Sequence, residues 1–120
     1  MKKIMVVENQ EELKNLFRLI LQMYNYEVGM AINAESLFTQ LEKERSDLIL
    51  LDMDLEFFGD AAADICSQLR SREHLKNIPV LLCSTSPQVL QKYGRMYSHT
   101  VIEKPFDLEE VTTKIRQLVN

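Results

Sequence analysis

Short apolar runs of strand length alternate along this chain with stretches in which apolar residues recur at helical spacing. A parallel sheet whose strands are connected by helices produces this alternation, and right-handed connections place the helices on both faces of the sheet. The run at residues 48–52 is apolar on both of its faces, as a buried parallel strand should be. The pattern predicts five strand–helix units, with strands at residues 3–7, 26–31, 48–52 and 100–103 and one that begins at Pro79.

Residues that favour helix starts precede most of the predicted helices. A side-chain oxygen before a helix can accept hydrogen bonds from the free N–H groups of the first turn, and a Glu three residues later completes a capping box. The helix near residue 90 is predicted to be short and to break near Gly94. The predicted starts are Asn9 with Glu12, Asn33 or Ser36, Ala61, Ser86 with Pro87, and Asp107 with Glu110.

Four of the predicted strands end in polar residues. These residues are the pair Glu8-Asn9, Asp52, Ser84 and Lys104. If the strands are parallel, all four ends lie at one edge of one sheet. An acid pair, a lone carboxylate, a hydroxyl and an ammonium at one mouth suit the binding of a cation and a phosphoryl group.

Composition argues against several classes of function. The chain has 120 residues, enough for one domain, and its 46% hydrophobic content is ordinary for a globular protein. A net charge of −4 argues against binding to nucleic acid, and the sequence shows neither a membrane-spanning run nor a signal peptide. We therefore expect a cytoplasmic protein with no membrane partner. Cys66 and Cys83 are expected to be buried reduced thiols, and His74 and His99 surface residues.

Four separated segments resemble, in order, the receiver domain of two-component response regulators. They are residues 3–10 (KIMVVENQ), 47–52 (DLILLD), 78–84 (IPVLLCS) and 103–106 (EKPF). The resemblance covers the whole chain, 1–120, as one receiver domain. It implies an α/β, flavodoxin-like, doubly wound sheet of five parallel strands in the order 2-1-3-4-5, with helices on both faces and a ligand crevice at the strand ends.

The resemblance implies a role for each residue at the strand ends. Asp52 would be the nucleophile that becomes an acyl phosphate, and Ser84 would donate its hydroxyl to a phosphoryl oxygen. Lys104 would pair with Asp52 and then with the phosphoryl group, aimed inward by a cis peptide bond before Pro105. The implied cofactor is Mg²⁺, held by oxygen ligands from Glu8, Asn9, Asp52 and Asp54.

The chain departs from the family at the implied metal site. Asn9 stands where the family usually has a second acid, and an amide oxygen ligates without charge. We therefore expect weak Mg²⁺ binding. Asp54 can offset the missing charge, because it would bring the carboxylates near the site to three, with Glu8 and Asp52.

Two further departures concern signalling. Val101 stands where the family has its aromatic switch residue, and Thr85 stands where the family prefers a very small residue. Valine cannot swing between buried and exposed states as tyrosine does, and Thr85 could narrow access to the site. The loop after Asp52 also carries an apolar pair, Phe57-Phe58, which we expect to tuck under the loop.

The implied function is that of a phosphoacceptor in a two-component phosphorelay, which catalyses only its own phosphorylation and dephosphorylation. Its expected partners are a sensor histidine kinase or a phosphotransfer protein, and a downstream protein effector. Because the chain ends with its last helix, we expect no attached output domain. Output would then run through non-covalent docking on the face built by the fourth helix, fifth strand and fifth helix, which could also form a homodimer.

Two alternatives remain open at this stage. A pseudo-receiver, a phosphorylation-independent interaction module, is favoured by Asn9, Thr85 and Val101. A phosphatase of the haloacid dehalogenase type is suggested by Asp52-Met53-Asp54, but that motif usually follows the first strand of its family and here follows the third.

Overall fold

The computed structural model of the chain describes residues 1–55, 61–97 and 99–119, and these residues form one parallel sheet of five strands in the order β2-β1-β3-β4-β5. The predicted fold class is therefore confirmed. The strands are β1 Lys3–Val7, β2 Glu27–Ala31, β3 Leu48–Asp52, β4 Val80–Ser84 and β5 Thr100–Glu103. The helices are α1 Glu11–Met23, α2 Ala34–Lys43, α3 Ala61–Ser71, α4 Pro87–Tyr97 and α5 Leu108–Val119.

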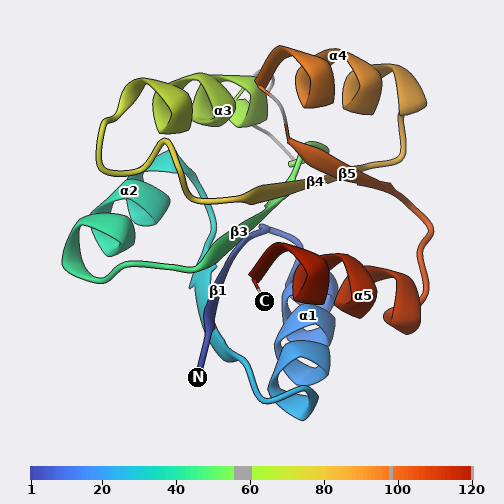
Figure 1. Ribbon diagram of the computed structural model, residues 1–120. Helices are drawn as coiled ribbons and strands as arrows, with labels where there is room; N and C mark the ends of the chain where they lie inside the picture. Colours follow the sequence, from blue (N-terminus) through green and yellow to red (C-terminus); the bar gives the residue numbers. More distant parts are fainter. Residues whose placement is uncertain (56–60, 98, 120) are drawn as a thin grey trace.

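Helices cover both faces of the sheet and create two apolar layers (Figure 1). One layer packs α2, α3 and α4 against the sheet, and the other packs α1 and α5 against it. Every residue of β3 and β4 is buried, because each of their faces is covered by one of these layers. Burial of this kind is the main source of stability for such a sheet, and it fixes the strand ends that carry the polar residues.

The register of the central strands brings their ends together. Asp52 is paired with Cys83, and Ser84 is paired with Glu103. Two further backbone hydrogen bonds extend the ladder beyond the strands: Met53 N–H donates to the Cys83 carbonyl at 2.8 Å, and Lys104 N–H donates to the Ser84 carbonyl at 2.8 Å. The predicted gathering of strand ends at one edge of the sheet is confirmed.

Three of the predicted helix starts are confirmed by their hydrogen bonds. Asn33 Oδ1 accepts from the Ser36 N–H at 2.8 Å, and Ser86 Oγ accepts from the Val89 N–H at 3.2 Å. Asp107 Oδ1 accepts from the N–H of Glu110 at 2.7 Å at the start of α5. Each of these side chains satisfies a donor that the first helical turn leaves free.

The predicted cap at Asn9 is wrong. Helix α1 begins at Glu11, and the residue at its N-cap position is Gln10, whose side chain makes no capping hydrogen bond. The Glu8 carboxylate instead accepts from the N–H groups of Asn9 and Gln10, at 3.0 and 3.1 Å. The buried Glu8 carboxylate therefore accepts the hydrogen bonds of the backbone N–H groups that immediately precede α1.

The predicted break near Gly94 is also wrong, because α4 continues through this residue to Tyr97. Gly94 is buried, and a Cβ atom placed on it would lie 2.8 Å from Val101 Cγ1. The glycine therefore permits close contact between α4 and β5. Packing against the neighbouring layer stabilises α4 despite the low helix propensity of glycine.

His99 was expected at the surface but is buried, with 9% of its area exposed. The Arg70 guanidinium reaches from α3 to this residue: Nη2 lies 3.2 Å from His99 Nδ1, and Nε donates to the Tyr97 carbonyl at 2.8 Å. A further Arg70 nitrogen donates to the Lys76 carbonyl. We call this group, Arg70 with Lys76, Tyr97 and His99, the arginine clip.

Burial and the positive charge of Arg70 lower the pKa of His99 to about 4. Cys66 and Cys83 are free and buried, as expected, and burial raises the pKa of both thiols. No helix in the described part of the chain combines the length and the apolar character needed to cross a bilayer. Phe57 and Phe58 lie outside the described residues.

Candidate functional site

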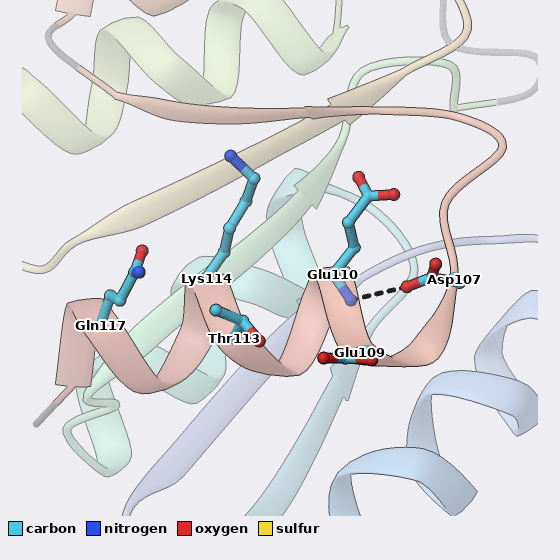
Figure 2. A pocket seen from close by; sticks show the side chains of 6 residues that line it. All are labelled: Asp107, Glu109, Glu110, Thr113, Lys114 and Gln117. Carbon is cyan, nitrogen blue, oxygen red and sulfur yellow. Dashed lines mark hydrogen bonds between the residues drawn. The ribbon is translucent and has the colours of Figure 1, made fainter.

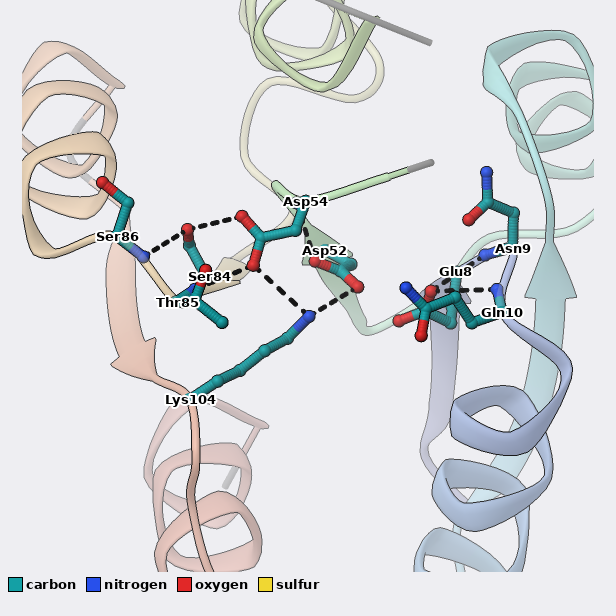
Figure 3. A network of polar contacts seen from close by, with 9 residues as sticks. All are labelled: Glu8, Asn9, Gln10, Asp52, Asp54, Ser84, Thr85, Ser86 and Lys104. Atoms are coloured by element: carbon teal, nitrogen blue, oxygen red, sulfur yellow. Dashed lines mark hydrogen bonds and ion pairs between the residues drawn. The ribbon is translucent and has the colours of Figure 1, made fainter. Parts of the chain in front are cut away.

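Asp52, the last residue of β3, forms the centre of the polar crevice at the strand ends (Figure 3). Its side chain is almost fully buried, and its two oxygens have different partners. Oδ2 accepts from Lys104 Nζ at 2.8 Å, and Oδ1 accepts from the backbone N–H of Asp54 at 2.8 Å. Among the described residues Lys104 is the charged donor to Asp52, and it can give way to another cation or pair with a phosphoryl group bonded to Asp52.

Lys104 enters the crevice from the end of β5, where the Lys104–Pro105 peptide bond is cis, as the resemblance implied. Its ammonium lies 2.8 Å from Asp52 Oδ2 and 3.5 Å from Asp54 Oδ2. Burial alone would lower the pKa of Lys104, but the hydrogen bond and charge of Asp52, with the charge of Asp54, raise it above its ordinary value. The side chain therefore remains a cation shared by two acids.

Asp54 faces the ends of β4 and β5 (Figure 3). Its Oδ1 accepts from Ser84 Oγ at 2.7 Å, and its Oδ2 accepts from the Thr85 N–H at 2.7 Å. Burial would raise the pKa of Asp54, but these two hydrogen bonds and the charge of Lys104 outweigh burial and lower it. Asp54 is therefore an ionised carboxylate whose two oxygens both accept from donors across the crevice.

Glu8 occupies the opposite side of the crevice, at the end of β1, and its side chain is fully buried. Its Oε2 has the two backbone donors described above, whereas Oε1 has no hydrogen-bond partner among the described residues. Burial and the nearby Asp52 carboxylate raise the pKa of Glu8 to about 8. A proton on Glu8 removes the repulsion between two buried ionised carboxylates.

These features test the implied metal site. A buried pair of acids, one with an unpartnered oxygen and a raised pKa, is an arrangement that a divalent cation would stabilise. Glu8 and Asp52 therefore fit Mg²⁺. No three acidic, histidine or cysteine side chains in the described part of the chain are grouped to hold a metal. The reason is Asp54, which the donors of Ser84, Thr85 and Lys104 hold on the other side of the crevice.

The structure brings Glu8, Asp52, Asp54, Ser84 and Lys104 into one crevice, as the sequence predicted, with Asn9 at its rim (Figure 3). The sequence did not reveal two backbone donors. The Thr85 N–H donates to Asp54, and the Ser86 N–H donates to Ser84 Oγ at 2.9 Å. Residue type does not mark a backbone donor, because every residue except proline has an N–H group. The predicted turn after β4 was therefore the one signal that could have indicated these donors.

A second hollow lies along the outer side of α5 (Figure 2). None of the crevice residues named above lines it. Its walls carry charged and polar side chains of a solvated helix face, and it contains no buried polar group that would mark a built site. Its lining residues are Asp107, Glu109, Glu110, Thr113, Lys114 and Gln117.

Comparison with known proteins gives a consistent result. Residues 4–116 match the family model described as the response regulator receiver domain. The uncharacterized transcriptional regulatory protein YvcP of Bacillus subtilis is 31% identical over 99% of this chain and 49% of its own length. The DNA-binding dual master transcriptional regulator RpaA of Synechocystis is 29% identical over the same shares. The chain thus spans about half the length of the curated relatives it matches.

Solved structures agree on the fold. The chemotaxis protein CheY4 of Vibrio cholerae is similar with a TM-score of 0.86, 22% identity and 98% of each chain covered. The receiver domain of the sensor histidine kinase PA1611 of Pseudomonas aeruginosa is similar with a TM-score of 0.83 and 19% identity, over 98% of this chain and 97% of that one. The latter is described with a magnesium ion coordinated in its active-site cleft.

Proposed function

Because this chain belongs to the response regulator receiver domain family, we propose that Asp52 accepts one phosphoryl group in a two-component phosphorelay. The observation that supports this most directly is the 2.8 Å contact between the buried Asp52 carboxylate and Lys104 Nζ. The Ser84 hydroxyl and the Thr85 N–H face the same mouth and supply donors for phosphoryl oxygens. The phosphodonor is the phosphohistidine of a sensor histidine kinase or of a phosphotransfer protein.

The proposed transfer is a nucleophilic substitution at phosphorus. An Asp52 oxygen forms a bond to phosphorus as the bond from phosphorus to the histidine nitrogen breaks, and the electron pair stays with the imidazole. Lys104 keeps its positive charge and offsets the negative charge that gathers around Asp52. Water later attacks phosphorus, releases inorganic phosphate and restores the carboxylate, so the chain catalyses only its own phosphorylation and dephosphorylation.

The residues proposed to hold Mg²⁺ are Glu8, Asp52, Asn9 through its amide oxygen, and Asp54 through its backbone carbonyl. When bound, the ion would offset the repulsion between the carboxylates and the incoming phosphoryl group. Glu8 has to release its proton before it can ligate, because its pKa is about 8. We expect weak binding, since Asn9 adds no charge.

Output is proposed to use the face formed by α4, β5 and α5, which would bind a protein effector or a second copy of the chain. Val101 packs against Gly94 in the layer between α4 and β5 and cannot act as an aromatic switch. The conformational change on phosphorylation should therefore be small and concentrated in the turn after Ser84.

The test is incubation with acetyl phosphate or phosphoramidate and Mg²⁺, followed by measurement of intact mass. We expect the mass of one added phosphoryl group in the native protein and none in Asp52→Asn. The variant Asp64→Asn removes one exposed carboxylate from α3 and should be labelled like the native protein. No added mass at saturating phosphodonor, or equal labelling of Asp52→Asn, would exclude the phosphoacceptor function.

One observation favours the second candidate, a pseudo-receiver. Asp54 already occupies the Ser84 and Thr85 donors, which the phosphoryl group would need. In that case the protein would bind its partners without labelling in the assay above. A phosphatase of the haloacid dehalogenase type is disfavoured by the same residue, because the lowered pKa of Asp54 makes it a poor general acid.

A further inference from the structure

We propose that the Asp54 carboxylate is a tethered anion that occupies the phosphoryl-binding donors of the crevice and must be displaced when Asp52 is phosphorylated. This inference rests on the proposed phosphoacceptor function and adds a control to the same site. It assigns Asp54 a role on the donor side of the crevice, which differs from the ligand role considered for Mg²⁺.

Asp54 engages the three donors that a phosphoryl group on Asp52 would need. Its Oδ1 accepts from the Ser84 hydroxyl at 2.7 Å, its Oδ2 accepts from the Thr85 N–H at 2.7 Å, and Oδ2 lies 3.5 Å from Lys104 Nζ (Figure 3). A hydroxyl, an N–H and an ammonium arranged around oxygens of one anion form a general oxyanion-binding set. The two oxygens of Asp54 satisfy this set in the absence of any phosphoryl group.

Other hydrogen bonds fix the positions of these donors. The Asp54 carboxylate therefore adapts to the donors, and the donors do not move to fit Asp54. Ser84 Oγ also accepts from the Ser86 N–H at 2.9 Å, which leaves its own hydrogen free to point at Asp54. The Ser84 carbonyl accepts from the Lys104 N–H at 2.8 Å, which ties the ends of β4 and β5 together. A carboxylate and a phosphoryl group would therefore compete for one fixed set of partners.

The tether keeps Asp54 at this position. It lies two residues beyond Asp52, and its own N–H donates to Asp52 Oδ1 at 2.8 Å. This turn directs the Asp54 side chain across the crevice, and Lys104 lies between the two acids and contacts both. A phosphoryl group that arrives on Asp52 meets both an occupied donor set and a second negative charge.

Two consequences follow. Binding of a phosphoryl group to Asp52 is weakened, because Asp54 first has to give up two hydrogen bonds to its charged oxygens. The turn after β4 is already ordered by an anion at rest, so Ser84 and Thr85 change little when the phosphoryl group replaces Asp54. Removal of the Asp54 carboxylate should therefore strengthen phosphoryl binding and loosen the resting turn.

The first measurement is hydrogen exchange of the Thr85 amide by NMR, without phosphodonor or metal. We expect exchange to be about tenfold faster or more in Asp54→Ala, since loss of a charge-assisted hydrogen bond exposes this amide to solvent. Asp64→Ala, which removes one exposed carboxylate from α3, serves as the matched control and should exchange like the native protein. Unchanged protection of Thr85 in Asp54→Ala would overturn the proposal.

The second measurement is titration with beryllofluoride, a phosphoryl mimic, in the presence of Mg²⁺. We expect Asp54→Ala to bind it about tenfold more tightly than the native protein and Asp64→Ala, because no anion has to be displaced. Asp54→Asn keeps the size of the side chain, serves if the alanine variant does not fold, and should also bind more tightly. Equal or weaker binding by the Asp54 variants, with binding by the native protein intact, would refute displacement and leave the proposed function standing.

If neither the native protein nor Asp54→Ala binds beryllofluoride, the proposed function fails. A further probe then tests the role of Asp54. Inorganic phosphate, added at increasing concentration, should shift the Thr85 amide resonance in Asp54→Ala and leave it unchanged in the native protein. No shift in Asp54→Ala would mean that the vacated donors do not form an oxyanion site.

Discussion

Lys104 and Arg70 both connect segments that are far apart in the sequence, but their partners differ in kind. Lys104 contacts two carboxylates, Asp52 and Asp54. Arg70, in the arginine clip, donates to the backbone carbonyls of Tyr97 and Lys76 and contacts a neutral histidine ring. One cation therefore faces acids that can take a proton, a metal or a phosphoryl group, and the other faces groups that cannot change their charge at neutral pH.

This difference separates a reactive site from a structural one. A carboxylate can exchange its partner through rotation of one side chain, as Asp54 would when a phosphoryl group arrives. A backbone carbonyl can leave Arg70 only if the end of α4 or the turn before β4 moves. The crevice should therefore respond to pH and ligands near neutral pH, whereas the arginine clip should respond only when acid protonates His99 or when its backbone segments move.

The largest expected effect is the loss of the arginine clip in Arg70→Met. The carbonyls of Tyr97 and Lys76 are partly buried, and a carbonyl left without its donor costs about 1–3 kcal/mol, so we expect a loss of roughly 3 kcal/mol in the free energy of unfolding. Denaturant unfolding followed by circular dichroism measures it, since the chain has no Trp. The exposed Arg95→Met should change stability by less than about 0.5 kcal/mol.

The same experiment on Lys104→Met sharpens the comparison. The loss should be smaller than in Arg70→Met, because Glu8 holds a proton below pH 8 and Asp54 keeps 28% of its side chain in solvent. If Lys104→Met proves to be the more damaging change, the crevice is a structural centre as well, and the distinction between the two regions is lost.

A second prediction concerns the acid pair. The folded-state pKa of Glu8 is about 8, above its ordinary value of 4.5, so the folded protein binds more protons than the unfolded chain between these values. Stability should therefore fall as pH rises from 4.5 to 8 and level off above that. Glu8→Gln cannot lose a proton, so its advantage over the native protein should grow across this range, by on the order of 2–3 kcal/mol.

Unfolding free energies at pH 5 and pH 9 measure this change. The exposed Glu103→Gln is the matched control and should retain the pH dependence of the native protein. If the stability of Glu8→Gln has the same pH dependence as that of the native protein, Glu8 ionises without penalty in the folded protein. Its Oε1 would then accept a hydrogen bond when ionised.

The arginine clip should show the opposite dependence on pH through His99. Its folded-state pKa is about 4, below the ordinary 6.5, so the unfolded chain binds more protons between these values. The stabilisation is complete above pH 6.5 and is lost as pH falls toward 4, by roughly 2 kcal/mol. His99→Gln should lack this part of the acid sensitivity, whereas the exposed His74→Gln should keep it. Equal behaviour of the two variants would show that His99 accepts a proton despite Arg70.

Much of the fold could be predicted because it depends on patterns that are local in the sequence. The buried runs of β3 and β4 are apolar throughout, and Asp52 and Ser84 follow them at the same edge. The caps at Asn33 and Asp107 were also predictable, because each side chain binds a donor within the next turn.

The failures at Asn9 and His99 come from burial, which depends on parts of the chain that are distant in the sequence. Asn9 lost its expected cap role because the neighbouring Glu8 carboxylate, buried by the sheet, took the backbone donors. His99 is buried because Arg70 reaches it from α3, 29 residues away. The hydrogen bond from the Ser84 hydroxyl to Asp54, 30 residues away in the sequence, was likewise not predicted. No pattern in the sequence shows which of several possible hydrogen-bond partners a group will bind in the folded protein.

The smallest expected effect tests how firmly α4 rests on β5 beside the arginine clip. In Gly94→Ala the added methyl would lie 2.8 Å from Val101 Cγ1, so something must shift. Overpacking of this kind costs about 1–3 kcal/mol, and alanine regains up to about 1 kcal/mol in helix propensity, so we expect a net loss of about 1 kcal/mol. In a Val101→Ala background the clash is gone, and the same change should become neutral or stabilising. Denaturant unfolding of the four proteins in this cycle measures the coupling. If Gly94→Ala stabilises the native background as well, the Val101 side chain rotates away at no cost. The contact between α4 and β5 would then rearrange as easily as the side chains of the crevice.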